Sequence, residues 1–283
     1  MRVGIVSAGA MGSAVGKTLL DGGAEVATTL DGRSERTARL AGKAGIEALP
    51  SLAAVVGGAD VVLSIAPPDQ AEAIARDVDA AAARTGTRPL VADLNAISPD
   101  TARRIESALA LDFVDASISG PPPARPGTTR IYVSGPRGAE IAALPFAGVE
   151  LIQVGGEVGS ASAVKMCTAS VYKGTAALLT HALVTAHANG VLSFVLDDLG
   201  DRADGAARML ANAAAKSGRY VGEMHEIAAT QAAAGLTPDL FEAIATLYAA
   251  IAERPAAMRA PEEIDAAPDL ESVLRGLTPE QRR

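Results

Sequence analysis

Residues 3–12 read VGIVSAGAMG, an apolar run followed by a turn of small residues, and a helical pattern follows at Ala14–Leu20. A strand that passes through a glycine-rich turn into a helix is typical of the first unit of a dinucleotide-binding sheet. Gly9 would let the backbone approach a pyrophosphate, and Gly12 would let the helix pack closely on the strand. Ser7 stands where such turns usually begin with glycine, so a plain packing turn is the alternative. We expect a pyrophosphate to bind at the helix N-terminus, on Ser7, Ala8, Gly9, Ala10, Met11 and Gly12.

The remainder of the first half alternates short apolar runs with helical patterns. The runs are mostly continuous, which is typical of parallel strands that are covered on both faces. The sequence therefore predicts an α/β fold, a Rossmann-type doubly wound parallel sheet over residues 1–155. Its expected strands are Val3–Val6, Glu25–Leu30, Asp60–Ile65, Leu90–Leu94, Phe113–Ala116, Ile131–Ser134 and Leu151–Val154. Its expected helices are Ala14–Leu20, Glu35–Ala44, Gln70–Ala83 and Pro99–Leu109.

Strand patterns stop near Gly156, and the second half is helical. We expect an all-α domain over residues 156–283, with a looser tail after Pro255. Because its helices are rich in Ala and the chain is only 3% aromatic, each helix buries little area. We therefore expect a homodimer through this domain, with a monomeric helical domain as the alternative. The expected helices are Ser160–Ala188, Ala203–Ala215, Tyr220–Ala234 and Pro238–Ala252.

The composition excludes several classes of protein. With 283 residues, 49% of them hydrophobic and 20% charged, the chain can build a sizeable core and is not disordered. A net charge of −8 argues against a nucleic-acid binder, which would carry a basic patch. The single Cys167 excludes an internal disulfide or a cysteine cluster and favours a reducing, cytoplasmic location. His181 and His187 are not spaced to share one helical face as metal ligands, so we expect no metal.

Two segments superficially resemble membrane signals. Val3–Val15 has the outline of a short signal peptide, but it is interrupted by glycine and fits a strand, turn and helix. Gly174–Leu196 contains no Asp, Glu, Lys or Arg, but Asn189-Gly190 breaks it, so a buried helix and a turn suit it better than a membrane span. We expect no membrane segment.

The end of the second strand, Leu30–Ser34, bears on the choice between NAD and NADP. An acid here binds the ribose 2′-hydroxyl, whereas an arginine suits a 2′-phosphate. Asp31 could be that acid, but a shift of one residue would turn it away from the ribose. Arg33 and Ser34 would then offer a guanidinium and a hydroxyl to the phosphate. We prefer NADP, with NAD as the alternative.

Four further segments carry a resemblance to a known family. They are Ser64–Pro67 (SIAP), Asp93–Pro99 (DLNAISP), Asp115–Pro121 (DASISGP) and Gly156–Cys167 (GEVGSASAVKMC). Together they resemble the β-hydroxyacid dehydrogenases, which are related to 3-hydroxyisobutyrate and 6-phosphogluconate dehydrogenases and to imine reductases. The chain also resembles a sub-branch whose C-terminal domain has no assigned function and no settled substrate.

The resemblance implies roles for particular residues. Ala66, Pro67 and Asn95 would flank the nicotinamide, and Lys165 would move a proton to or from the substrate oxygen. The strand end would bind the substrate through Ser119, Gly120 and Pro121, with Pro121 in place of the family's second glycine. A Lys on an Ala-rich helix would otherwise be read as a surface residue.

The chain departs from the family after Lys165. Where the family usually has Asn three and four residues later, this sequence has Thr168 and Ala169. Thr168 keeps a hydroxyl, and Tyr172 lies two turns along the same face, so it could replace the lost amide or be a core aromatic. Arg219 is a further candidate for an anionic substrate, with a solvated charge as the alternative. Cys167 fits a buried, inert thiol.

The sequence thus predicts an NADP-dependent oxidoreductase for a small polar, anionic hydroxy or carbonyl compound. Two alternatives remain open. One is an imine reductase of the same superfamily, although such enzymes often carry another residue in place of Lys165. The other is an NADP-binding sensor that transfers no hydride.

Overall fold

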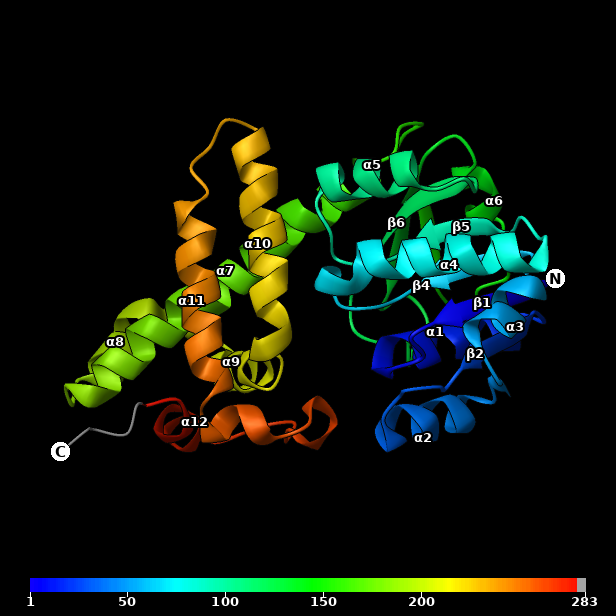
Figure 1. The fold of residues 1–283 in the computed structure, drawn as a ribbon. Coiled ribbons are helices and arrows are strands. Elements are labelled where there is room, and N and C mark those ends of the chain that lie inside the picture. Colours follow the sequence, from blue (N-terminus) through cyan, green and yellow to red (C-terminus); the bar gives the residue numbers. More distant parts are fainter. Residues whose placement is uncertain (279–283) are drawn as a thin grey trace. The chain divides into compact units, whose positions relative to one another are not determined.

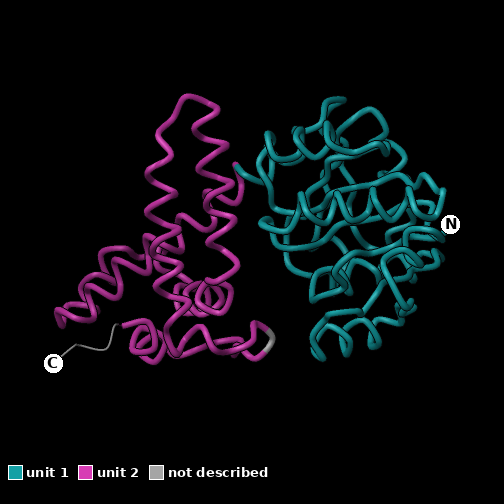
Figure 2. Tube along the Cα trace, in the orientation of Figure 1, with its two compact units in different colours: residues 1–166 teal, residues 167–283 magenta. Residues whose placement is uncertain are grey.

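The computed structural model describes residues 1–278, apart from the side chain of residue 262, and divides into two compact units (Figure 2). Unit 1 is residues 1–166 and unit 2 is residues 167–283; residues 279–283 of the predicted helical domain lie outside the described residues. The sequence pattern predicted a boundary at 155/156 instead. The difference arises because the first turn of α7 (Ser160–Ala188) is hydrogen-bonded to the sheet of unit 1.

Unit 1 is built on one eight-stranded sheet with the order β3-β2-β1-β4-β5-β6-β7-β8. The order reverses between β1 and β4, which is the switch point where such sheets bind ligands beyond the carboxyl ends of their strands. The strands are β1 (Arg2–Val6), β2 (Glu25–Thr29), β3 (Glu47–Leu49), β4 (Val61–Ser64), β5 (Leu90–Asp93), β6 (Phe113–Ser119), β7 (Arg130–Ser134) and β8 (Glu150–Gln153).

Helices cover both faces of this sheet. Side chains from the strands alternate between two cores, one on each face of the sheet. Val3, Ile5 and Leu63 lie in the core under α1, α2 and α6. Val62 and Val91 lie in the core under α3, α4 and α5. The helices are α1 (Ala10–Asp21), α2 (Glu35–Ala44), α3 (Leu52–Gly57), α4 (Ala71–Thr85), α5 (Pro99–Ala108) and α6 (Gly138–Ala142). The doubly wound sheet that the sequence predicted is confirmed.

One strand pair departs from the all-parallel prediction. β7 runs antiparallel to β6, with Asp115 opposite Ser134 and Ser119 opposite Arg130. No helix lies between these two strands, and a loop over residues 120–129 returns the chain directly. A direct return of this kind joins antiparallel neighbours, whereas parallel ones need a longer crossover.

Unit 2 is helical throughout its described part, apart from connecting turns. α10 and α11 form the most extensively packed pair and join through a short connection, which makes a helical hairpin (Figure 1). Leu183, Met224, Phe241 and Tyr248 are among its buried side chains. Besides the later part of α7, its helices are α8 (Leu192–Leu199), α9 (Ala206–Ala214), α10 (Ser217–Ala233), α11 (Asp239–Ala252) and α12 (Leu270–Leu277).

The two segments that superficially resembled membrane signals have other structures. Val3–Val15 forms β1, the turn and the start of α1, and Gly174–Leu196 covers the end of α7 and the start of α8. In residues 1–278 no helix combines the length and the apolar character that crossing a bilayer requires.

Candidate active site

The turn between β1 and α1 combines one strained residue with two glycines. Ser7 has a φ of 71°, and among the described residues it is the one non-glycine with a positive φ; such a conformation costs on the order of 1–2 kcal/mol. A Cβ on Gly12 would lie 2.3 Å from the Ser7 carbonyl oxygen, so a side chain cannot fit there. A Cβ on Gly9 would meet nothing within 4 Å.

The open side of Gly9 leaves room for a ligand at the N-terminus of α1. The first turn of α1 contains no acidic residue, so the partial positive charge of the helix end is not offset there. The residues present therefore fit a phosphate group, which helix N-termini bind through backbone N–H groups.

The end of β2 leads into a tight turn and then α2. Arg33 N donates to Leu30 O at 3.0 Å, and Gly32 in this turn has a φ of 66°. Ser34 caps α2, because its Oγ accepts a hydrogen bond from Thr37 N at 3.3 Å. Asp31 is exposed and Arg33 is half-buried, so both candidates for the ribose remain accessible and the contacts do not separate NAD from NADP.

At the ends of β4 and β5 a buried network holds the Ala66–Pro67 loop. Asn95, 2% exposed, accepts a hydrogen bond from Ala66 N at 2.5 Å through its Oδ1. Its Nδ2 donates to Asp93 Oδ2 at 2.7 Å and to Ser64 Oγ at 3.0 Å. Asn95 and Ala66 were expected at one site, and the network shows that they touch.

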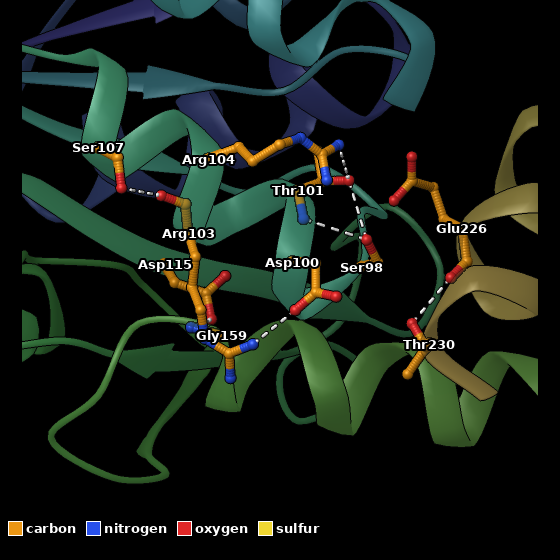
Figure 3. Close-up of polar contacts among 10 residues, drawn as sticks. All are labelled: Ser98, Asp100, Thr101, Arg103, Arg104, Ser107, Asp115, Gly159, Glu226 and Thr230. Atoms are coloured by element: carbon orange, nitrogen blue, oxygen red, sulfur yellow. Dashed lines mark hydrogen bonds and ion pairs between the residues drawn. The ribbon is translucent and has the colours of Figure 1, made fainter. Parts of the chain in front are cut away.

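A second buried network attaches α7 to β6. Asp115 Oδ2 accepts hydrogen bonds from Gly159 N and Ser162 N at 2.9 and 3.0 Å, and Ser162 Oγ donates to Asp115 Oδ1 at 2.6 Å (Figure 3 shows Asp115 beside Gly159). Ser134 Oγ also donates to Asp115 Oδ2, at 2.9 Å. The carboxylate therefore acts as an N-terminal cap supplied by a neighbouring strand.

Two further bonds fix the same turn. Ser117 Oγ donates to Ala161 O at 2.8 Å, and Ala161 N donates to Ser134 Oγ at 3.0 Å. Since these bonds tie the start of α7 to β6 and β7, residues 156–166 belong to unit 1.

This attachment brings Lys165 to the end of β6. Its Nζ donates to Ile118 O at 2.8 Å, immediately before the half-buried Ser119. Gly120, with a φ of 112°, must be glycine, because a Cβ would lie 2.4 Å from Thr128 O. Pro121 is exposed, and its carbonyl accepts a hydrogen bond from Thr129 Oγ1 at 2.7 Å. The end of β6 thus combines the Lys165 ammonium, the Ser119 hydroxyl and an exposed backbone turn at Gly120 and Pro121.

The other predicted substrate residues belong to unit 2. Thr168 is half-buried, and Tyr172 is 73% exposed, so the core-aromatic alternative for Tyr172 is wrong. Cys167 is exposed, which contradicts the expectation of a buried thiol. Arg219 Nε donates to Glu223 Oε1 at 3.1 Å, so it is ion-paired within unit 2.

The sequence patterns assign no role to the buried groups that hold the site together. Asp93 and Asp115 lie within the motifs DLNAISP and DASISGP, but no local pattern distinguishes Ser64, Ser134 and Ser162. A signal was present: an aspartate at the end of an apolar strand must be buried or functional, since charged groups are rarely buried without partners. Among residues 1–278, no group of three or more His, Cys, Asp or Glu could hold a metal ion.

The fold and the glycine turn are those of a dinucleotide-binding domain, and comparison with known proteins identifies the family. The model for the NAD binding domain of 6-phosphogluconate dehydrogenase matches residues 2–146, and a domain of unknown function, DUF1932, matches residues 186–251. The chain belongs to the family of NAD(P)-binding oxidoreductases that share this domain. The predicted resemblance to the 3-hydroxyisobutyrate dehydrogenase group is confirmed.

Solved structures resemble the chain over most of its length. A conserved protein of unknown function, described as similar to 3-hydroxyacid dehydrogenases, is 30% identical with a TM-score of 0.66, over 89% of this chain and 97% of that one. The Mycobacterium tuberculosis 3-hydroxyisobutyrate dehydrogenase is 20% identical with a TM-score of 0.68, over 97% and 98% of the two chains. A Myxococcus stipitatus imine reductase is 16% identical with a TM-score of 0.55, over 88% and 92%. The last two likenesses show the shared fold.

Proposed function

We propose that the protein is an NADP-dependent oxidoreductase, located in the cytoplasm, that acts on a small polar, anionic hydroxy or carbonyl compound. The observation that carries the proposal is the 2.8 Å bond from Lys165 Nζ to Ile118 O. It holds an ammonium beside Ser119 and Gly120, at the carboxyl end of a strand in a nucleotide-binding sheet, where such folds place their ligands.

The cofactor residues divide into three groups. The turn residues Ser7–Gly12 would bind the pyrophosphate with the N-terminus of α1. Arg33 and Ser34 would bind the 2′-phosphate, and the Ser34 hydroxyl can still donate while its oxygen caps α2. Ala66–Pro67 and Asn95 would border the nicotinamide, which when bound gives or accepts the hydride.

Lys165 would act as the general acid or base. In carbonyl reduction its ammonium donates a proton to the substrate oxygen, and in alcohol oxidation the amine takes that proton back. Ser119, Gly120 and Pro121 would hold the polar end of the substrate. Thr168 and Tyr172 would add hydroxyls from the same helix as Lys165, and Arg219 is a candidate partner for the anionic group.

A panel of small aldehydes and oxo-acids tests the reaction class through initial rates of NADPH oxidation, each with and without an added amine. We expect carbonyl reduction that needs no amine. Rates that appear only with amine would identify an imine reductase. Tight NADPH binding without turnover of any partner would support a sensor.

Lys165→Met provides the first prediction. Turnover should fall by about 10²–10⁴-fold, because the proton donor is lost, whereas NADPH affinity should change less than twofold. Lys43→Met, at an exposed position on α2, is the matched control and should keep normal rates. Initial rates and calorimetric titration measure both quantities. Retained turnover in Lys165→Met would refute the mechanism.

We also propose a homodimer through unit 2. An uncharged stripe of exposed residues follows α7 at helical spacing, at Val171, Thr175, Leu178, Ala182 and Thr185. α8 buries none of its eight residues, and its Phe194 is 73% exposed. Exposed apolar surface of this kind marks association sites.

The second prediction concerns this surface. Leu178→Glu combined with Phe194→Glu should convert a dimer to a monomer, because two charges would be buried without partners. Sedimentation velocity measures the change, and Leu236→Glu is the control at an exposed apolar position outside the stripe and α8. A wild-type chain that sediments as a monomer at micromolar concentration would contradict the proposal.

A further inference from the structure

Two buried carboxyl groups lie side by side where β5 ends next to the first half of β6. Asp93 and Asp115 are register partners on these adjacent parallel strands, and their exposed fractions are 2% and 0%. Asp115 is committed to α7 through Gly159, Ser162 and Ser134. Asp93 instead accepts hydrogen bonds from Asn95, which in turn accepts one from Ala66 N.

All the hydrogen-bond partners shown for Asp93 are donors. Asn95 N donates to Oδ1 at 2.8 Å, Asn95 Nδ2 donates to Oδ2 at 2.7 Å, and Ser64 contributes a side-chain hydrogen bond. This arrangement suits an ionised carboxylate, which only accepts hydrogen bonds. It also fixes the Asn95 amide, so that Oδ1 points to Ala66 N.

Burial opposes that charge. It is the main cause that raises the pKa of Asp93 to about 7, and the negative charge of Asp115 raises it further, against the hydrogen bonds from Asn95 and Ser64. Asp115 on β6 is the charged group that acts on Asp93 among the described residues; β4 contributes the neutral Ser64 and β5 itself leads to the neutral Asn95. Burial and Asp115 therefore favour the protonated carboxyl, whereas the hydrogen bonds from Asn95 and Ser64 favour the carboxylate.

A proton on Asp93 needs an acceptor, and two neighbours can supply one: the Asn95 amide, if it rotates, and the Ser64 hydroxyl. If the Asn95 amide rotates so that Oδ1 accepts the Asp93 proton, Oδ1 moves away from Ala66 N. The Asn95 NH₂ group then points at the Ala66 N–H, and both are donors. The Ala66 N–H then loses the acceptor that holds the Ala66–Pro67 loop. The alternative is that Ser64 Oγ accepts the proton, which would leave Asn95 in place.

We propose that Asp93 is a positioning residue for the nicotinamide end of the cofactor site: as a carboxylate it holds Asn95 and the Ala66–Pro67 loop in the binding arrangement, and on protonation it releases them. The inference rests on the proposed nucleotide function. It adds a pH-dependent step to that function, through a group that touches neither cofactor nor substrate.

Calorimetric titration at pH 6 and pH 8 tests the proposal with two ligands, NADPH and 2′-phospho-ADP-ribose, which lacks the nicotinamide. Because both carry the 2′-phosphate, the ratio of their Kd values cancels the titration of that group. In the wild-type protein NADPH should bind more tightly than 2′-phospho-ADP-ribose, and the ratio of their affinities should fall about tenfold from pH 8 to pH 6. This is the effect of one lost hydrogen bond. If the protein prefers NAD, NADH and ADP-ribose replace the pair.

Variants separate the possible causes. Asp93→Asn is neutral at every pH and should show the smaller advantage at both pH values, whereas Asp112→Asn, an exposed carboxylate just before β6, should behave like wild type. Ser64→Ala removes the alternative proton acceptor, so it should keep the pH dependence even if Asp93→Asn fails to fold; loss of the dependence in Ser64→Ala would contradict release through Asn95. Thermal unfolding checks each variant.

Two results would overturn the proposal. One is a wild-type ratio that does not change with pH. The other is Asp93→Asn retaining the wild-type change. Failure of the wild type to bind either ligand would instead overturn the nucleotide function itself, and this inference with it.

Discussion

The buried carboxylates of the two units have different partners: neutral hydrogen-bond donors in unit 1 and charged side chains in unit 2. In unit 1, Asp93 and Asp115 are surrounded by neutral donors: backbone N–H groups, serine hydroxyls and the Asn95 amide. In unit 2, the Glu223 side chain is 5% exposed and forms an ion pair with Lys173, which is itself 11% exposed, and with Arg219.

The ion pair of Glu223 with Lys173 joins helices of unit 2, whereas Asp93 and Asp115 lie at the candidate active site of unit 1. The Lys173 ammonium also lies 4.7 Å from the centre of the Tyr220 ring, and Tyr248 Oη donates to Lys173 O at 2.8 Å, so the pair joins α7, α10 and α11. A buried ion pair matched in this way keeps both charges. Asp93 is held by neutral donors instead, and burial raises its pKa to about 7.

Breaking the ion pair should have the largest effect on stability. Glu223→Gln removes the carboxylate that pairs with the buried Lys173 ammonium, and we expect the free energy of unfolding to fall by about 3–5 kcal/mol. Chemical denaturation measures the loss. The matched control is Glu242→Gln, whose pair with His225 is exposed and should contribute under about 1 kcal/mol. Similar losses in both variants would erase the distinction between the units.

The next largest effect should come from Asp93 and depend on pH. Because its pKa is raised to about 7 in the folded protein, the folded state binds this proton more tightly than the unfolded state does. That stabilisation is fully present below about pH 4 and is lost as pH rises through 7. Between pH 5 and pH 8 the free energy of unfolding, measured by chemical denaturation, should fall by about 2–3 kcal/mol more in the wild type than in Asp93→Asn. Parallel stability curves for the two proteins would contradict the titration of Asp93.

The smallest effect should come from removing one neutral donor. Ser162→Ala deletes the 2.6 Å bond to Asp115 Oδ1 but leaves the backbone donors of Gly159 and Ser162. We expect a loss of about 1–2 kcal/mol, measured by the same denaturation, and a well-folded protein. A loss as large as that of Glu223→Gln would show that the Asp115 network is as tightly coupled as the ion pair.

Local sequence patterns predicted the long elements because their signals are contained within them. α2 and α7 begin and end where expected, at Glu35–Ala44 and Ser160–Ala188. β3 and α3 were missed because three and six residues are too few to establish a period. α8 was missed because none of its residues is buried, so its apolar pattern does not mark a core-facing side.

The sequence predicted which residue types form the candidate site, but it did not predict the hydrogen bonds that join them. The turn at Ser7–Gly12 and the Lys165 motif are local patterns. The partners of Asp115 are not, because they depend on the register of β6 with β7 and on the return of α7, 44 to 47 residues later in the chain. The pairing of Asp93 with Asp115 likewise requires the register of β5 with β6.

Ser7 has a consequence for how this lineage can vary. A single nucleotide change converts a glycine codon to serine, and a penalty on the order of 1–2 kcal/mol is small beside the 5–15 kcal/mol by which domains are typically stable. The first position of the turn therefore tolerates serine as well as glycine, because serine can adopt the backbone angle at this cost. Gly12 has no such freedom, because a side chain there would collide with the Ser7 carbonyl.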